Sequence, residues 1–214
     1  MNDGNDYFAH DRPEVAGLLP QVYQRVLEIG CGEGRFRRHL SQQCHYTGVE
    51  PSPTAAAIAR LAIDEVFTGT FDQVAQQLPL QSFDLVICND VIEHMADHDK
   101  FLGEIQRYMA PGAWLVGSVP NVRYFFHLWD LLIRKDWPYK DQGILDRTHL
   151  RFFTHRSWRR TLSSHGFVVE RLCGLNQPNW GERLVRRWLK LGAATVIGSD
   201  SKFLQIGFAA RLDV

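Results

Sequence analysis

Three glycines at alternate positions follow a short apolar segment near the start of the chain. The segment Val26–Phe36 reads VLEIGCGEGRF and contains Gly30, Gly32 and Gly34. Such a turn between a strand and a helix lets a ligand approach the main chain closely, because no Cβ stands in the way. The pattern therefore predicts a binding site for a nucleotide-like ligand, although a plain connecting turn is the alternative.

The glycine spacing does not fit the dinucleotide-binding pattern G-x-G-x-x-G. From Gly30, that pattern needs a third glycine at position 35, where the sequence has Arg35. A carboxylate at Glu28 would repel a pyrophosphate, whereas it would attract a ligand that carries a cationic group. No Lys-Ser or Lys-Thr follows the glycines, so the phosphate-binding P-loop does not fit either. An NAD(P)-linked oxidoreductase is kept as an alternative.

Further polar residues follow two other predicted strands. Glu50 ends the second strand, 22 positions after Glu28. A carboxylate there can accept hydrogen bonds from both hydroxyls of a ribose, or it can be a solvated strand end. Asn89 and Asp90 follow the continuous apolar run Phe83–Cys88, which is typical of a central parallel strand. Ligands bind at the carboxyl ends of such strands, so ligand binding and a structural role in the loop are equally good interpretations.

Together these features resemble the class I S-adenosylmethionine-dependent methyltransferases, both the ubiquinone-type and the polysaccharide-associated bacterial ones. The glycine turn matches their first motif, FDLVICNDVIEH (Phe83–His94) resembles their fourth strand and its loop, and MAPGAW (Met109–Trp114) resembles the start of their fifth strand. The resemblance implies a methyltransferase with S-adenosyl-L-methionine as its cofactor. This cofactor carries an ammonium and a sulfonium but no phosphate, so acidic neighbours favour its binding.

The resemblance also implies the residues that bind the cofactor. They are Glu28, Gly30, Cys31, Gly32, Gly34, Glu50, Pro51, Phe71, Asp72, Asn89 and Asp90. After the third strand the family often has Gly-Asp-Ala, but this chain has Gly69-Thr70-Phe71. The adenine contact then passes to Asp72 or to the backbone of Phe71. Cys31 is expected to fill space, because no neighbouring base is evident that would activate its thiol.

Three histidines are candidates for a general base. Methyl transfer is an in-line displacement that needs alignment, and a hydroxyl acceptor also needs a group to take its proton. His94 follows the fourth strand, while His127 and His149 lie in the segment after the fifth. For His94 a packing role is an equal alternative. We expect no metal site, because the four cysteines lack CxxC spacing and the acidic cluster at 97–99 is typical of a polar helix start.

The order of apolar segments predicts an α/β fold with a doubly wound parallel sheet. The strand candidates are Val26–Ile29, Tyr46–Glu50, Glu65–Thr68, Phe83–Cys88, Trp114–Val119, Phe167–Cys173 and Phe203–Leu212. The helix candidates are Gly34–Ser41, Thr54–Leu61, Asp99–Met109 and a helix that Thr154 caps and that ends at Ser164. The resemblance implies a Rossmann-like sheet of seven strands in the order 3-2-1-4-5-7-6, with strand seven antiparallel and helices on both faces.

We expect a single methyltransferase domain over residues 1–214, with a substrate-covering insertion at about 121–151 and a helical insertion at about 176–200. The stretch GILDRTHLRFFT (Gly143–Thr154) resembles small bacterial methyltransferases that are encoded with glycosyltransferases for cell-surface polysaccharides. This favours O-methylation of a small molecule or of a cell-surface glycan or glycolipid precursor. A non-catalytic cofactor-binding subunit is the alternative.

Charge and hydropathy bear on partners and location. Lys+Arg and Asp+Glu both number 24, so no nucleic-acid partner is expected. No signal peptide or membrane span is evident, which favours a cytoplasmic location. The stretch 180–191, WGERLVRRWLKL, has an apolar and a basic helical face. It could lie on the inner face of the membrane as a peripheral contact, or pack on the domain or on a second subunit in a homodimer.

Overall fold

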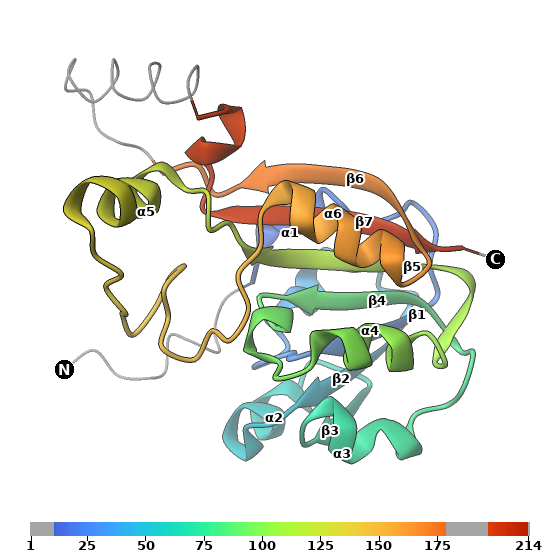
Figure 1. The fold of residues 1–214 in the computed structure, drawn as a ribbon. Coiled ribbons are helices and arrows are strands. Elements are labelled where there is room, and N and C mark those ends of the chain that lie inside the picture. Colours follow the sequence, from blue (N-terminus) through green and yellow to red (C-terminus); the bar gives the residue numbers. More distant parts are fainter. Residues whose placement is uncertain (1–10, 179–196, 214) are drawn as a thin grey trace.

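The computed structural model describes residues 11–178 and 197–213, and within them seven strands form one sheet in the order β3-β2-β1-β4-β5-β7-β6 (Figure 1). Strand β7 runs antiparallel to both of its neighbours, and the other neighbouring pairs are parallel. This confirms the predicted sheet. The strands are β1 (Arg25–Ile29), β2 (His45–Glu50), β3 (Glu65–Thr68), β4 (Phe83–Asn89), β5 (Met109–Pro120), β6 (Phe167–Leu175) and β7 (Gln205–Leu212).

Helices cover both faces of the sheet. One face carries α3 (Phe71–Val74), α4 (His98–Ile105) and α6 (His155–Ser164), and the other carries α1 (Pro13–Ala16), the 3-10 helix η2 (Arg35–His39) and α2 (Pro53–Ala59). Successive strand residues point to opposite faces. Val26 accordingly packs in the cluster with α1 and α2, and Leu27 packs in the cluster with α4 and α6.

Helix α6 shows how local sequence sets an element. The Thr154 side chain accepts a hydrogen bond from the Ser157 backbone N–H at 3.1 Å, as expected for an N-cap. Trp158 and Leu162, four residues apart, are fully buried against the sheet. Gly166 follows the helix with a φ of 75°, a backbone conformation that favours glycine. The predicted helix is therefore confirmed at both ends.

Two predicted helices differ from the structure. The residues after the glycine turn form only the short 3-10 helix η2, in which Phe36 is the buried residue among basic neighbours. The helix ends because Leu40, which packs in the same cluster as Phe36, has an extended backbone with φ −94° and ψ 155°. Helix α4 ends at Ile105 instead of Met109, because Met109 pairs with Phe83 as the first residue of β5.

The segment after β5 lies beyond the carboxyl ends of the parallel strands (Figure 1). It forms α5 (Phe125–Trp129) and the π-helical turn η5 (Asp130–Arg134), as the expected partly helical insertion. Backbone N–H groups of Leu150 and Arg151 donate to the Glu93 carbonyl at 2.8 and 3.0 Å, so the returning chain is tied to the loop after β4. Three further short helices are η3 (Ala75–Gln77), η4 (Ile92–His94) and η6 (Ser199–Lys202). The expected helix at 180–191 lies outside the described residues.

Candidate functional site

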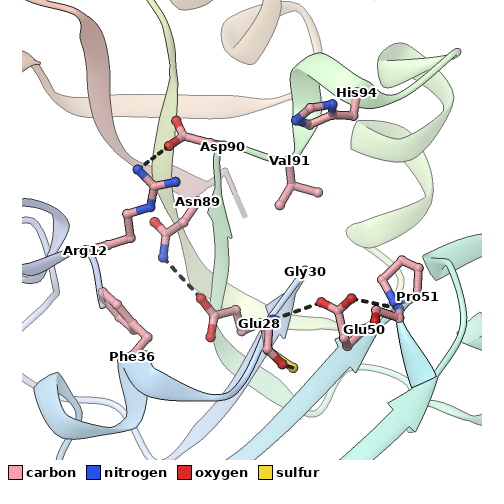
Figure 2. Close-up of a pocket in the computed structure, with 13 residues that line it drawn as sticks. Arg12, Glu28, Gly30, Phe36, Glu50, Pro51, Asn89, Asp90, Val91 and His94 are labelled. Carbon is pink, nitrogen blue, oxygen red and sulfur yellow. Dashed lines mark hydrogen bonds and ion pairs between the residues drawn. The ribbon is translucent and has the colours of Figure 1, made fainter. Parts of the chain in front are cut away.

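A cavity of about 470 Å³, the first cavity, opens at the carboxyl ends of β1, β2 and β4 (Figure 2). It is the switch point of the sheet, where β1 is flanked by β2 on one side and β4 on the other. Most of the predicted cofactor-binding residues line it. They are Glu28, Gly30, Cys31, Gly32, Glu50, Pro51, Asn89 and Asp90.

The glycine turn forms one wall of the first cavity and approaches its neighbours closely. Gly30, Gly32 and Gly34 have φ values of 72°, 54° and 77°, all in the left-handed region that favours glycine. A Cβ added at Gly30 would lie 2.6 Å from a methyl carbon of Val91. The turn is held to β2, because the N–H groups of Gly30 and Cys31 both donate to the Val49 carbonyl.

Glu50 is fixed in the wall opposite Glu28. The Gly32 N–H donates to its Oε2 at 2.9 Å, and the Ser52 N–H donates to its Oε1 at 2.8 Å. Burial raises the pKa of this carboxyl, and the two backbone hydrogen bonds act in the opposite direction. Each carboxylate oxygen can accept a further hydrogen bond, so the group is oriented to receive a pair of hydroxyls.

Glu28 lies deeper and is almost fully buried. The Asn89 amide donates to its Oε1 at 3.1 Å, and the Tyr46 hydroxyl donates to its Oε2. Burial raises the pKa of Glu28 to about 8, although the hydrogen bond from Asn89 lowers it. At neutral pH this carboxyl therefore holds its proton, and a cation entering the cavity would favour the ionised form.

Asp90 joins three parts of the chain at the edge of the first cavity. Its carboxylate pairs with the Arg12 guanidinium at 2.7 Å, accepts a hydrogen bond from the Ser118 hydroxyl at 2.9 Å and another from the Gln205 amide. Figure 2 shows Arg12 and Asp90 facing one another across the upper wall. Arg12 was not among the predicted residues, because a lone arginine before a proline carries no sequence signal of its own. Phe36, Ser52 and Val91 also line the cavity without having been predicted.

A second cavity, of about 290 Å³, adjoins the first, and Arg12, Asp90 and His94 line both. Its other lining residues come from the loop after β4, from the insertion and from the segments next to β7. They are Glu93, Pro120, Gln142, Gly143, Ile144, Asp146, His149, Asn176, Leu204 and Gln205. Most of these side chains are polar, so the second cavity is suited to a ligand with several hydrogen-bonding groups.

Two of the three candidate histidines meet at the second cavity. The rings of His94 and His149 lie edge to face with their centroids 4.7 Å apart. Burial lowers the pKa of His94, and the neighbouring His149 lowers it further, so His94 is neutral at pH 7. His127 lies elsewhere, in a cavity of about 180 Å³, with its ring edge to face with Trp137 at 4.6 Å.

Glu93 is a third chemical group at the second cavity, and it was missed as a site residue. Its side chain is 0% exposed, and neither carboxylate oxygen has a hydrogen-bond partner in the part of the chain that the structure describes. Burial, followed by the charge of Asp90, raises the pKa of Glu93 well above its ordinary value. An acidic side chain directly after the apolar pair Val91 and Ile92 was the signal that could have found it.

Three predicted cofactor residues do not line the first cavity. The Phe71 side chain packs in the core against Phe101 and Tyr108, and the exposed Asp72 carboxylate lies 3.4 Å from the Lys100 ammonium. Gly34 instead packs against Ile63. Cys31 does line the cavity, and burial raises the pKa of its thiol, in keeping with a neutral space-filling role. Asp72, which was expected to contact an adenine, therefore does not line the first cavity and pairs with Lys100 instead.

Comparison with known proteins shows the family to which the chain belongs. A family described as a methyltransferase domain matches residues 4–172, well over half of the chain. The chain belongs to this family. S-adenosylmethionine is accordingly its cofactor. The first cavity has features that fit such a molecule, because it holds a carboxylate oriented by two backbone N–H groups and a buried carboxyl group that a cation would ionise.

Individual relatives agree with the family. Ubiquinone biosynthesis O-methyltransferase of Pseudomonas aeruginosa is 32% identical over 116 residues, which are 50% of this chain and 48% of that protein. Trans-aconitate 2-methyltransferase of Deinococcus radiodurans is 29% identical over 111 residues, which are 50% of this chain and 42% of that protein. The chain thus spans about half the length of the curated relatives it matches.

Solved structures share the fold. An S-adenosylmethionine-dependent methyltransferase from Thermotoga maritima, described as a possible histamine N-methyltransferase, superposes with a TM-score of 0.64 at 18% identity. The match covers 95% of this chain and 88% of that one. No helix among residues 11–178 and 197–213 has the length and apolar character needed to cross a bilayer.

Proposed function

We propose that this chain transfers the methyl group of S-adenosylmethionine to a hydroxyl oxygen of a small molecule or of a cell-surface glycan or glycolipid precursor. The observation that carries the proposal is the contact between the two cavities. Arg12, Asp90 and His94 line both, so a ligand in the first cavity would meet a ligand in the second at these three residues. When bound, the cofactor supplies a methyl group activated by a sulfonium.

The residues of the chain supply alignment. Glu50 holds a ligand's hydroxyl pair through a carboxylate fixed by two backbone N–H groups, and Glu28 stabilises a cationic group at the other end of the first cavity. Fixing both reactants in adjoining cavities replaces an encounter in solution by a unimolecular step, which is where much of the rate enhancement arises.

The acceptor hydroxyl must also lose its proton. The imidazoles of His94 and His149 are the groups at the second cavity that can assist, either as bases or through a cation that they bind. His127 does not line the second cavity itself but a smaller cavity that adjoins it, so it serves the proposed reaction less well.

The lining of the second cavity supports a hydroxyl-rich acceptor. Its polar side chains include Gln142, Asn176 and Gln205, whereas Pro120, Ile144 and Leu204 supply its larger apolar groups. Among the residues that the structure describes, no aromatic side chain other than histidine lines this cavity. Hydrogen-bonding groups of this kind select a polyhydroxylated molecule over an extended apolar one, since a polar group buried without a partner is costly.

The test is a transfer assay with radiolabelled S-adenosylmethionine and panels of nucleotide sugars, lipid-linked sugars and phenols. We expect label to enter a sugar hydroxyl and the rate to fall when Asp146 or Gln205 is replaced by alanine. If the chain binds S-adenosylhomocysteine but labels no acceptor in any panel, the chain is a cofactor-binding subunit and the proposal is wrong.

A further inference from the structure

Glu93, His94 and His149 surround a common point at the second cavity. One potential ligand atom from each residue lies within 4.8 Å of the other two. We propose that these three side chains bind one divalent transition-metal cation, and that this cation holds and activates the hydroxyl group of the acceptor. The second half of the inference rests on the proposed function, whereas the metal site itself can be tested alone.

The environment of Glu93 favours a bound cation. The side chain is completely buried at the wall of the second cavity, yet neither of its oxygens accepts a hydrogen bond of good geometry from another described residue. Its own backbone N–H lies close enough only to lower its raised pKa in part. Buried carboxylates are costly unless they are paired with a cation or coordinate a metal. The nearest basic atom, Nε2 of His149, lies 3.9 Å from Oε1, which is too far for a hydrogen bond. A cation between these two atoms would satisfy both groups.

The two histidines are oriented as metal ligands commonly are. Nδ1 of His149 lies 3.0 Å from the Ile144 carbonyl, and Nδ1 of His94 lies 3.3 Å from the Thr148 carbonyl. A carbonyl oxygen only accepts, so each Nδ1 carries the proton at these contacts. In His149 this leaves Nε2, 3.9 Å from Oε1 of Glu93, as the nitrogen that faces the carboxyl group. A backbone carbonyl that fixes the tautomer in this way is a frequent outer partner of a metal-binding histidine.

The charges around the second cavity favour a cation. The carboxylates of Asp90 and Asp146 line it, together with the buried Glu93 carboxyl group, which a bound cation would favour in its ionised form. The one guanidinium among its described lining residues, that of Arg12, already pairs with Asp90 at 2.7 Å. Asp146 is also tied to the outer partners, because its Oδ1 accepts a 2.6 Å hydrogen bond from the Thr148 hydroxyl, which in turn lies 3.1 Å from His94 Nδ1.

The ligand set and spacing suggest the type of metal. Ligand atoms about 2.0–2.2 Å from a tetrahedral zinc ion lie roughly 3.4 Å apart, so the three side chains would have to draw together by about an ångström to close the site. Two imidazoles and one carboxylate suit Zn²⁺, Mn²⁺, Fe²⁺ or Co²⁺ better than Mg²⁺ or Ca²⁺, which prefer oxygen ligands. Three protein ligands also leave positions open toward the cavity.

The open coordination positions would let the hydroxyl group of the acceptor bind the cation. A hydroxyl bound to the cation has a lowered pKa, so its proton passes to water and its oxygen attacks the methyl carbon. The new O–C bond forms as the S–C bond breaks, and the sulfur keeps the electron pair. This assignment revises the expectation from the sequence, in which no metal site was foreseen.

Cobalt binding tests the site without any acceptor. The probe is Co²⁺, added to the full chain without an affinity tag and followed by calorimetry and visible absorption. We expect one equivalent to bind with the spectrum of a site that has nitrogen ligands, Zn²⁺ to displace it, and Mg²⁺ to leave it in place. Glu93→Gln and His149→Gln should each weaken Co²⁺ binding by at least about tenfold.

The matched control is His45→Gln, which alters an exposed histidine at the opposite, amino-terminal end of β2. It should bind Co²⁺ as the wild type does. The inference is overturned if the wild-type chain binds no Co²⁺, Zn²⁺ or Mn²⁺ in stoichiometric amount, or if folded Glu93→Gln and His149→Gln chains keep the wild-type affinity. The wild-type measurement decides the matter even if a variant does not fold.

Calorimetry with S-adenosylhomocysteine on the same samples separates this inference from the proposed function. Cofactor binding without metal binding would overturn the metal site and leave the methyltransferase proposal standing. Metal binding without cofactor binding would support the metal site and count against the proposed function.

Discussion

At the scale of single residues, the two buried glutamates of the first cavity have different environments and therefore different roles. Glu50 accepts two backbone N–H bonds that support its charge, and Glu28 accepts from an amide and a phenol in a fully buried place. We therefore expect Glu50 to accept hydrogen bonds from hydroxyl groups, and Glu28 to lose its proton when a cation binds beside it. Each difference can be measured.

Replacing Glu50 tests the ribose contact. Glu50→Ala should weaken S-adenosylhomocysteine binding by about 2–3 kcal/mol, because hydrogen bonds to a charged group are lost. Calorimetry gives the affinity, and Glu170→Ala on the exposed surface of β6 is the control with no expected effect. An unchanged affinity in a folded Glu50→Ala chain would remove this residue from the site.

Glu28 predicts a pH dependence of cofactor affinity. Its pKa is raised to about 8, so it is neutral below that pH and must release its proton to meet the ammonium of S-adenosylhomocysteine. Glu50 and Arg12 act on the same carboxyl in opposite directions. Affinity should therefore increase with pH up to about 8, by at most about tenfold per pH unit, and then level off.

Titrations in buffers of different ionisation enthalpy measure the protons released on binding. Glu28→Gln should bind with little dependence on pH over the same range and should release fewer protons. Equal proton release by the wild type and by Glu28→Gln would show that another group is responsible.

At the scale of elements, the glycine turn has a packing role in addition to its place at the ligand. A Cβ at Gly34 would lie 3.0 Å from two carbons of the Ile63 side chain and 3.3 Å from the Ala59 Cα at the end of α2. The third glycine therefore brings the turn against α2, and only the first two line the first cavity. Gly30 and Gly32 thus line the ligand cavity, whereas Gly34 allows the turn to pack against α2.

This predicts opposite effects for two glycine-to-alanine changes. Gly34→Ala should lower the free energy of unfolding by roughly 2–4 kcal/mol, from the cost of a left-handed alanine and from overpacking. Gly103→Ala, within α4 and with nothing within 4 Å of the added Cβ, should raise it by about 0.5–1 kcal/mol. Urea denaturation measures both, and a neutral Gly34→Ala would contradict the packing role.

At the scale of the whole molecule, the insertion after β5 completes the second cavity and is held to the sheet through few backbone contacts. It contributes Gln142, Asp146 and His149, and its return is anchored by two hydrogen bonds to the Glu93 carbonyl. Long insertions with this arrangement commonly act as covers over a bound ligand.

Hydrogen exchange should detect such a cover. Amides of residues 121–151 should exchange more slowly once S-adenosylhomocysteine and an acceptor are bound, including those of Leu150 and Arg151. Amides of β4, in the middle of the sheet, are the internal reference. Equal exchange of the insertion with and without both ligands would argue against a cover.

A membrane contact is a separate prediction that rests on the sequence alone, because residues 180–191 lie outside those described. An amphipathic basic helix there should bring the protein to vesicles rich in anionic lipid at low salt. Flotation measures this, and Arg186→Glu with Arg187→Glu should abolish it. The membrane contact through residues 180–191 is ruled out if the wild type does not float, or if the wild type and the double variant float equally.

The local patterns of the sequence determined a doubly wound sheet and the core of the first cavity, whereas the strand order and the antiparallel seventh strand followed only from the family resemblance. Apolar segments alternating with helical ones specify a doubly wound sheet, and parallel strands end at a shared edge, so residues just after β1, β2 and β4 must meet there. Glu28, Gly30 and Glu50 could therefore be placed at one cavity without coordinates.

Only the tertiary structure decided what adjoins that cavity. Arg12 reaches Asp90 from the start of the chain, and His149 reaches Glu93 from the insertion, 55 positions after His94. No local pattern encodes such contacts, because they arise from how the loops return across the sheet. For the same reason Asp72, close to the site in sequence, turns to Lys100 on a neighbouring helix, while the buried Glu93 comes to line a second cavity.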